Sequence, residues 1–160
     1  MPRLARLLCA ALIGIGLAGC DSAPSSYLDD NRDDLRVWFA CTDFEEAPVG
    51  GSVQGALTDE DCYGYGINGI KHSADHYIVE IAERTMAEIR VDMGGGARPA
   101  IALRTVSNDR YASPRQTLEP GGRGQVARME VDYLPGVSVI TVTTLGAGES
   151  GPYTLSIREL

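Results

Sequence analysis

Short segments with period-two alternation constrain this chain more than any other feature of its sequence. Apolar and polar residues alternate at 77–82, 88–93, 128–133 and 153–158. Because successive side chains of a β-strand point to opposite faces of a sheet, each segment predicts a strand with one buried and one solvated face. Two further runs, 100–106 and 137–144, are rich in β-branched and apolar residues on both faces, which is typical of central strands.

Turn-forming residues separate these segments. Gly and Pro clusters occur at 94–96, 119–122, 134–136 and 146–148. Successive strands are about a dozen residues apart and no convincing long helix intervenes, so the sequence predicts an all-β, antiparallel, jelly-roll-like β-sandwich. Residues 80–90 also permit a helix, but a turn at 83–85 between two strands fits the alternation better.

The first nineteen residues have the composition of an export signal. Arg3 and Arg6 precede an apolar run at 7–18. Twelve helical residues rise only about 18 Å, against roughly 30 Å of bilayer hydrocarbon, so the run is too short to span a membrane. It predicts a cleaved signal peptide over residues 1–19.

The end of this run carries a more specific pattern. Leu17-Ala18-Gly19-Cys20 resembles the lipobox of bacterial lipoproteins. The resemblance implies cleavage between Gly19 and Cys20, with a diacylglyceryl group on the sulfur of Cys20 and an acyl chain such as palmitate on its amino group. The alternative is an ordinary secretory signal with a chance Cys at the cleavage point.

The net charge and the predicted lipoprotein signal are both consistent with a protein of the bacterial cell envelope. The formal net charge of −8 becomes −10 once the signal and its two Arg are removed, so acyl chains must provide the membrane attachment. The scattered basic residues exclude a nucleic-acid partner, because binding to phosphates needs clustered Lys and Arg. We expect the domain to face the periplasm. Asp21 resembles a signal for retention at the inner membrane in enteric bacteria, and the choice of membrane stays open.

An acidic tether is predicted to follow the lipidated cysteine, over residues 20–34. Asp29, Asn31 and Asp33 fit the first half of a calcium loop, but the glycine and the final glutamate of such a loop are missing. A solvated charge run is the simpler interpretation. Residues 35–42 then predict a short strand or helix, and the sandwich is expected to occupy residues 35–160.

Two cysteines remain after the signal is removed and Cys20 is lipidated. Cys41 and Cys62 are expected to form one disulfide, as paired thiols of exported proteins do. The bond would close a loop of about twenty residues and stabilise the fold by roughly 3 kcal/mol. A zinc site needs more ligands than two cysteines supply.

The body of the chain resembles a known family over about residues 50–160. The motifs are Gly55-Ala56-Leu57-Thr58-Asp59-Glu60-Asp61-Cys62, Asp75-His76-Tyr77, Leu134-Pro135-Gly136 and Gly151-Pro152-Tyr153-Thr154-Leu155-Ser156-Ile157. They look like those of the bacterial pre-peptidase C-terminal domain. That resemblance implies a jelly-roll-like sandwich without catalytic residues, usually appended to secreted enzymes; here we expect a lipid anchor in that place.

Ligands and calcium follow from the same resemblance. Some members of the family bind collagen or polysaccharide, and some bind calcium through acidic residues near the start of the domain. Asp59, Asp61 and Asp75 are therefore weak calcium candidates, and a calcium-stabilised structural domain is one alternative function. No other cofactor is expected.

Two patterns suggest a second alternative, a small envelope hydrolase. Gly148-Glu149-Ser150-Gly151-Pro152 is similar to the nucleophile segment of trypsin-like proteases, but few residues follow Ser150 to build a specificity pocket. His72 and His76 have the spacing of a zinc-protease helix, but the activating Glu is absent. We expect a glycine-rich hairpin loop at Ser150, and an exposed loop and a strand edge at the two histidines.

The leading prediction is therefore not an enzyme. We expect a lipid-anchored, non-catalytic binding or scaffolding β-sandwich that recognises a protein or glycan in the envelope. Its binding residues are not defined by the sequence, because loops on one fold carry many unrelated functions.

Overall fold

The computed structural model describes residues 41, 43–65, 71–107, 110–111, 126–133 and 135–160. Every regular element within these ranges is a β-strand, as the alternation of the sequence predicts. A search of the same ranges finds no helix long and apolar enough to cross a membrane. The predicted signal peptide, the tether and residues 35–40 lie outside the described residues.

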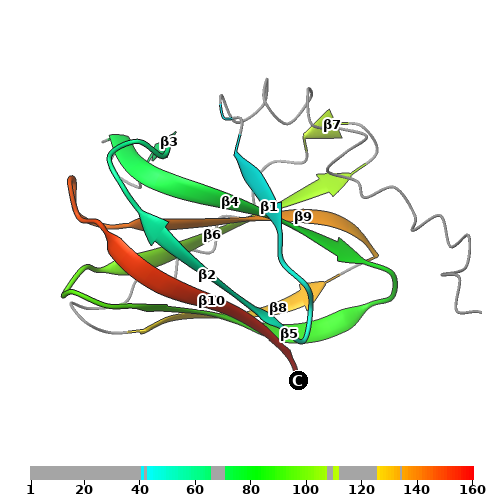
Figure 1. The fold of residues 1–160 in the computed structure, drawn as a ribbon. Coiled ribbons are helices and arrows are strands. Elements are labelled where there is room, and N and C mark those ends of the chain that lie inside the picture. Colours follow the sequence, from blue (N-terminus) through cyan, green and yellow to red (C-terminus); the bar gives the residue numbers. More distant parts are fainter. Residues whose placement is uncertain (1–40, 42, 66–70, 108–109, 112–125, 134) are drawn as a thin grey trace, which may run out of the picture.

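In the part of the chain that the structure describes, ten strands form two sheets packed face to face (Figure 1). The strands are β1 (Phe44–Glu46), β2 (Ser52–Leu57), β3 (Cys62–Tyr65), β4 (Lys71–Ile81), β5 (Thr85–Met93), β6 (Pro99–Ser107), β7 (Arg110–Tyr111), β8 (Val126–Tyr133), β9 (Gly136–Thr144) and β10 (Gly151–Glu159). The first sheet has the order β1-β4-β9-β6-β7, and β3 also pairs with β4. The second sheet has the order β2-β10-β5-β8. This arrangement confirms the predicted sandwich.

All six strands predicted from the alternation and the apolar runs are present, as β4, β5, β6, β8, β9 and β10. The strands β6 and β9 lie inside the first sheet, as their apolar residues on both faces predict. The turn predicted near 83–85 is confirmed, because β4 ends at Ile81 and β5 begins at Thr85. No helix forms there.

The short strands β1, β2, β3 and β7 were not predicted, and one of them changes the topology. β1 runs parallel to β4, with Phe44 opposite His76, so the sheet is not purely antiparallel. A three-residue segment with two glutamates carries too little alternation to reveal a strand. β2 was concealed by Gly55, since a glycine in a strand weakens its propensity.

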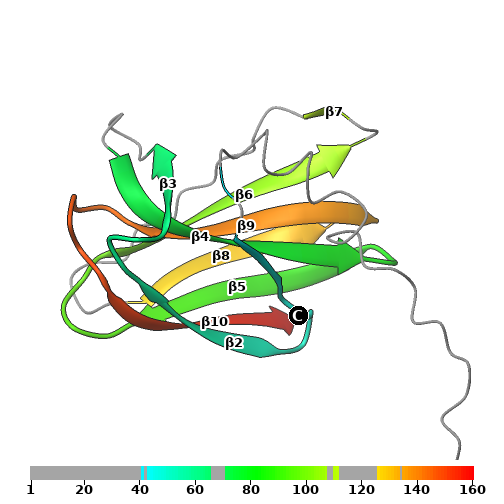
Figure 2. The same cartoon turned by 45° about the horizontal axis from the view of Figure 1, so that its top comes forward.

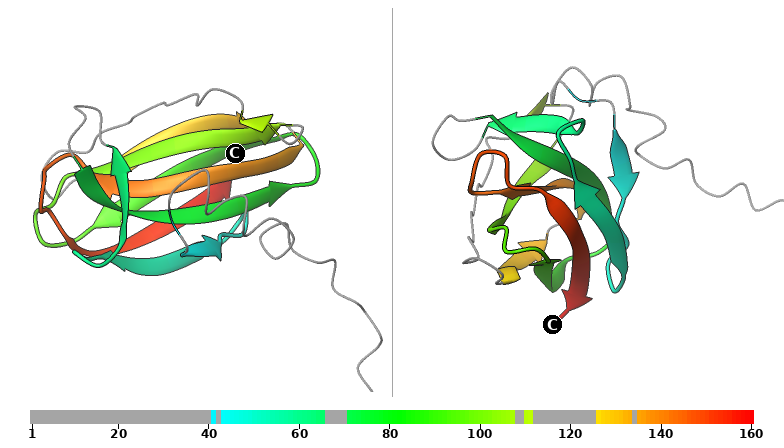
Figure 3. Two further views of the ribbon diagram at one scale, coloured as in Figure 1. Left: turned by 90° about the horizontal axis from the view of Figure 1, so that it is seen from above. Right: turned by 60° about the vertical axis from the view of Figure 1, so that its left-hand side comes forward.

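The main core fills the space between the two sheets. Ile140 and Val142 of β9 and Leu155 and Ile157 of β10 belong to the same core cluster, and all four are buried. In Figure 2, β2 and β10 lie side by side beneath β4 and β9. Figure 3 (left) shows β4 and β9 passing in front of β10. Burying each such side chain contributes about 1.5–3 kcal/mol, which makes this layer the main source of stability.

The two sheets differ at the faces that point away from this core. The outward residues of the first sheet are buried as well, among them Ala74, His76, Ile78, Val139 and Thr141. They lie outside the main core cluster. The Phe44 ring stacks on His76 with a centroid distance of 5.4 Å and covers part of this face. The outward residues of the second sheet, such as Arg128 and Glu130, instead reach solvent. Among the described residues, the second sheet therefore presents the more accessible outer face.

Candidate functional site

The predicted disulfide is present. Cys41 precedes β1 and Cys62 begins β3, and their sulfurs are bonded with a Cα–Cα distance of 5.5 Å. The bond therefore ties the segment before β1 to the strand that pairs with the first half of β4. Cys20 and Gly19, the predicted lipidation and cleavage residues, lie outside the described residues.

The three calcium candidates have different surroundings in the structure. Asp61 folds back onto Thr58, accepting hydrogen bonds from the Thr58 backbone N–H and from its hydroxyl at 2.9 Å. Asp75, on β4, accepts a hydrogen bond from the Tyr153 hydroxyl. Asp59 is exposed in the turn between β2 and β3. The described residues contain no group of three or more His, Cys, Asp or Glu arranged to hold a metal ion.

Asp75 belongs to a hydrogen-bonded chain that links the two sheets. The Tyr153 hydroxyl, from β10, donates its single proton to Asp75, so the Tyr77 hydroxyl must donate to the Tyr153 oxygen, 2.6 Å away. The two tyrosine rings meet edge to face. Tyr77 and Tyr153 are almost completely buried, and their hydroxyls are satisfied by this chain. These hydrogen bonds between Tyr77, Tyr153 and Asp75, which we call the tyrosine chain, join the two sheets without leaving the two hydroxyls unpaired.

Gly55 of β2 makes room for the tyrosine chain. A Cβ atom at residue 55 would lie 2.5 Å from the Tyr153 ring and 2.9 Å from the Tyr77 hydroxyl. These separations are far below van der Waals contact. Gly55 is therefore required by the packing of the two tyrosines.

Burial controls the electrostatics of these groups. The pKa of Asp75 is raised to about 6. Burial is the main cause, the hydrogen bond from Tyr153 opposes it, and the nearby carboxylates of Asp61, Glu45 and Asp43 add to it. Burial, together with the Asp75 hydrogen bond, raises the pKa of Tyr153 far above its ordinary range. The Tyr153 hydroxyl consequently keeps its proton at neutral pH and remains a donor.

His72 and His76 are not exposed, contrary to the prediction. They lie on the same face within β4, and they are only 2% and 4% exposed. His76 Nδ1 is 2.9 Å from the Thr141 hydroxyl. Burial, helped by the positive charge of Arg104, lowers the pKa of His76 to about 4, so the imidazole is neutral at pH 7. The prediction was wrong because β4 begins at Lys71, earlier than the alternation indicated.

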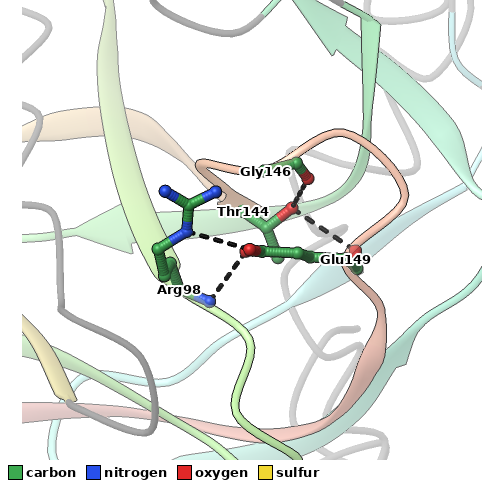
Figure 4. Close-up of polar contacts among 4 residues, drawn as sticks. All are labelled: Arg98, Thr144, Gly146 and Glu149. Atoms are coloured by element: carbon green, nitrogen blue, oxygen red, sulfur yellow. Dashed lines mark hydrogen bonds and ion pairs between the residues drawn. The ribbon is translucent and has the colours of Figure 1, made fainter.

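Ser150 lies in the loop between β9 and β10, as the glycine-rich segment predicts. An ion pair fixes this loop to the segment before β6 (Figure 4). The Arg98 backbone N–H and Nε donate to the two carboxylate oxygens of Glu149, each at 2.9 Å. Burial raises the pKa of Glu149, but these hydrogen bonds lower it by more, so it lies below its ordinary value. The Thr144 hydroxyl donates to the Gly146 carbonyl at 3.1 Å and completes the loop.

The outer face of the second sheet carries two adjoining depressions. One has a volume of about 580 Å³ and lies over β2, β10 and β5 near Gly94. The other, of about 420 Å³, lies over β10, β5 and β8 near Gly51. They share Arg90 and Ser156, so they form one groove along β10. We call this surface the β10 groove.

Polar and charged side chains lie on the floor and walls of the β10 groove. Thr154 and Ser156 point outward from β10 and form a shallow floor, and Gln54, Asp92 and Arg90 rise on either side. Arg90 Nη2 lies 3.2 Å from an Asp92 carboxylate oxygen. Such a surface offers hydrogen-bond donors, acceptors and both signs of charge.

One solved structure supports the fold. No family model matches the chain, and no curated protein matches its sequence. The pre-peptidase C-terminal domain of collagenase from Bacillus anthracis superposes with a TM-score of 0.51 at 21% sequence identity, over 72% of this chain and 94% of that domain. This chain has the fold of a pre-peptidase C-terminal domain. The PliG protein of Aeromonas hydrophila, a periplasmic inhibitor of g-type lysozyme, matches with a TM-score of 0.45 at 16% identity, over 74% of this chain and 98% of PliG.

Neither the tyrosine chain nor the β10 groove was predicted as a site. The alternation does place Arg90, Arg128 and Arg158 on the solvated faces of three predicted strands. Which of these strands are neighbours, and in which register, depends on long-range pairing that one sequence does not reveal. The groove therefore appears only in the folded structure.

Proposed function

We propose that this chain is a lipid-anchored envelope protein whose β-sandwich is a non-catalytic binding module for a protein or glycan. The β10 groove carries the proposal, because it is an exposed polar surface on the second sheet, whereas the outward residues of the first sheet are buried. The fold of the collagenase domain is compatible with a binding role but does not establish one.

The lipid anchor rests on the sequence. Residues 1–19 act as the signal, Cys20 carries the acyl chains, and residues 20–34 space the sandwich from the bilayer. Two or three acyl chains give stable attachment where one does not. Replacing Cys20 with Ala should abolish labelling by palmitate and move the protein out of the membrane fraction. Unchanged labelling would contradict the anchor.

The binding role is tested by blocking the groove. Ser156→Tyr fills the floor that the two depressions share, and Ala147→Tyr adds the same ring to the exposed β9–β10 loop as a matched control. Each full-length variant is isolated from its native envelope with the partners cross-linked to it. We expect partners that the Ala147→Tyr variant retains to be lost from the Ser156→Tyr variant. Equal recovery from both variants would contradict binding through the groove.

The hydrolase alternative is separated by one further variant. Ser150→Ala removes the hydroxyl of the protease-like segment while leaving the Arg98–Glu149 ion pair in place. We expect its partner binding and its phenotype to equal those of the native protein. A lost phenotype with retained partners would favour the hydrolase.

Calcium is tested separately from binding. Thermal melts in calcium and in chelator should coincide if the domain needs no metal. A higher melting temperature in calcium would instead support the calcium-stabilised domain suggested by Asp59, Asp61 and Asp75.

A further inference from the structure

Three arginines gather at one end of the β10 groove. Arg90 of β5 lies directly opposite Arg128 of β8 in the ladder. On its other side Arg90 lies opposite Ser156 of β10, so Arg158, two residues further along β10, is its diagonal neighbour. Each arginine alternates with a core residue and therefore points outward. We call this end, with the depression of about 420 Å³ that the three residues line, the arginine depression.

Positive charge is in excess in the arginine depression. Among the described residues that line it, Glu88 is the only acid, and Glu88 Oε1 lies 3.5 Å from Arg158 Nη2. The Asp92 partner of Arg90 lines the other depression. Arg128 makes no ion pair with any residue that the structure describes. Three guanidinium groups and one carboxylate thus line the arginine depression, with Asp92 pairing Arg90 from outside it, in a chain whose formal net charge is −8.

This arrangement has a cost that a bound anion would offset. Like charges directly opposite in an antiparallel pair are destabilising, as Arg90 and Arg128 are here. A carboxylate between two guanidinium groups instead receives charge-assisted, bidentate hydrogen bonds. Space is available, because Ser156 is short and a Cβ atom added to Gly50, at the rim, would meet nothing within 4 Å.

We propose that the arginine depression binds the carboxylate side chains of an extended acidic segment of a partner protein. The proposal rests on the function proposed above and names the chemistry of the partner. Same-face side chains of an extended segment repeat about every 6.6–6.8 Å, the spacing at which outward residues recur along β10, so one segment lying along the groove reaches both depressions. The groove also lacks an exposed aromatic side chain among its described lining residues, because the Tyr153 ring is buried against Tyr77. A sugar ring has no such surface to stack on.

The test uses the full chain, purified in detergent, and defined probes. The first probe is a short fluorescein-labelled peptide of alternating Glu and Thr, and the second has Gln in place of each Glu. We expect fluorescence anisotropy to show at least about tenfold tighter binding of the Glu peptide, with the difference shrinking as salt rises. Arg128→Gln should weaken Glu-peptide binding by about tenfold or more, since a charge-assisted bidentate contact is lost, and Arg128→Lys should fall between.

Arg84→Gln is the matched control. Arg84 precedes β5 and its guanidinium is paired with Asp132, outside the arginine depression, so this variant should bind the Glu peptide as the native protein does. Arg128→Gln should melt no lower than the native protein, because it relieves a like-charge pair. A loss of binding in that variant then reflects the site and not the fold.

Three results would overturn the inference. They are equal affinity for the Glu and Gln peptides, equal weakening by Arg84→Gln and Arg128→Gln, and tighter binding of polygalacturonate than of the Glu peptide, which would assign the site to an anionic glycan. If partners are lost from Ser156→Tyr while the Glu peptide fails to bind, the inference fails and the proposed function stands. If Ser156→Tyr also retains every partner, both fail.

Discussion

The outer faces of the two sheets both lie opposite the main core, but they are in different environments. In the first sheet many outward residues are uncharged, such as Ala74, Ile78 and Thr141, and they are buried. In the second sheet the outward residues include Glu88, Arg90 and Arg128, which line a groove open to solvent. Alternation therefore defines a strand, but the charge of the residues between the core positions shows which outer face remains accessible.

The strongest test of this contrast places the same charge on both faces. Thr141 and Thr154 lie on the interior strands β9 and β10 and both point away from the core. Thr141→Lys should lower the free energy of unfolding by about 3 kcal/mol or more, because it buries a second cation close to His76 and the positive charge of Arg104. Thr154→Lys, opposite Asp92, should change it by less than about 0.5 kcal/mol.

Chemical denaturation of both variants measures the difference. Equal losses would show that the first sheet's outer face is accessible after all.

Removing the disulfide tests what holds Phe44 against the outer face of the first sheet. It fixes the chain just before Phe44, the ring that stacks on His76. Replacing Cys41 and Cys62 with Ser should lower the free energy of unfolding by about 3 kcal/mol. Adding reductant should lower the melting temperature of the native protein to about that of the double variant and leave the double variant unchanged. A shift in the double variant would show that the reductant acts elsewhere.

A third test concerns the inner face of the second sheet. Gly55→Ala should destabilise by about 1–3 kcal/mol, because its Cβ atom would overlap the Tyr153 ring. Gly94→Ala is the matched control, since a Cβ atom there would meet its nearest neighbour, the Pro152 carbonyl oxygen, at 3.9 Å. We expect the control to melt within a degree or two of the native protein. Equal effects would contradict the packing of the tyrosine chain.

Much of the fold was predictable, and the reason is local. The alternation located four strands, the two apolar runs located two more, and the cysteine count gave the disulfide between Cys41 and Cys62. Strand order was not predictable, because the neighbours of β10 are β2 and β5, which are distant in sequence. The register that places Arg90 opposite Arg128 has the same origin. The burial of His76 was missed because a polar residue between apolar ones resembles a solvated position.

Asp75 and His76, adjacent on β4, should make the stability depend on pH in opposite directions. The pKa of Asp75 rises in the folded protein from 3.8 to about 6, so its protonated form stabilises the fold at low pH and this contribution is lost as pH rises through about 6. The Asp75→Asn side chain does not ionise, so the variant does not lose this stability as pH rises. Relative to the native protein, the variant should therefore become progressively more stable between about pH 4 and pH 7, as measured by melting temperature.

His76 provides a control of opposite sign. Its pKa falls from 6.5 to about 4, so its neutral form stabilises the fold above pH 6.5 and this contribution is lost as pH falls toward 4. Relative to the native protein, the His76→Asn variant should therefore become more stable as pH falls from about 7 to about 4. If both variants follow the native curve, neither group is buried as the structure indicates.

The smallest expected effect compares two ion pairs. Arg84 and Asp132 form a pair on the second sheet whose side chains are 68% and 40% exposed, and Arg84→Gln should leave the melting temperature unchanged within error, because solvent screens such pairs. Glu149 is only 18% exposed and accepts two hydrogen bonds from Arg98, so Glu149→Gln should cost about 1 kcal/mol. Raising the salt concentration should narrow the difference only slightly, since the more buried pair is screened less. A larger loss from Arg84→Gln would show that the exposed face contributes to stability and is not free to serve binding alone.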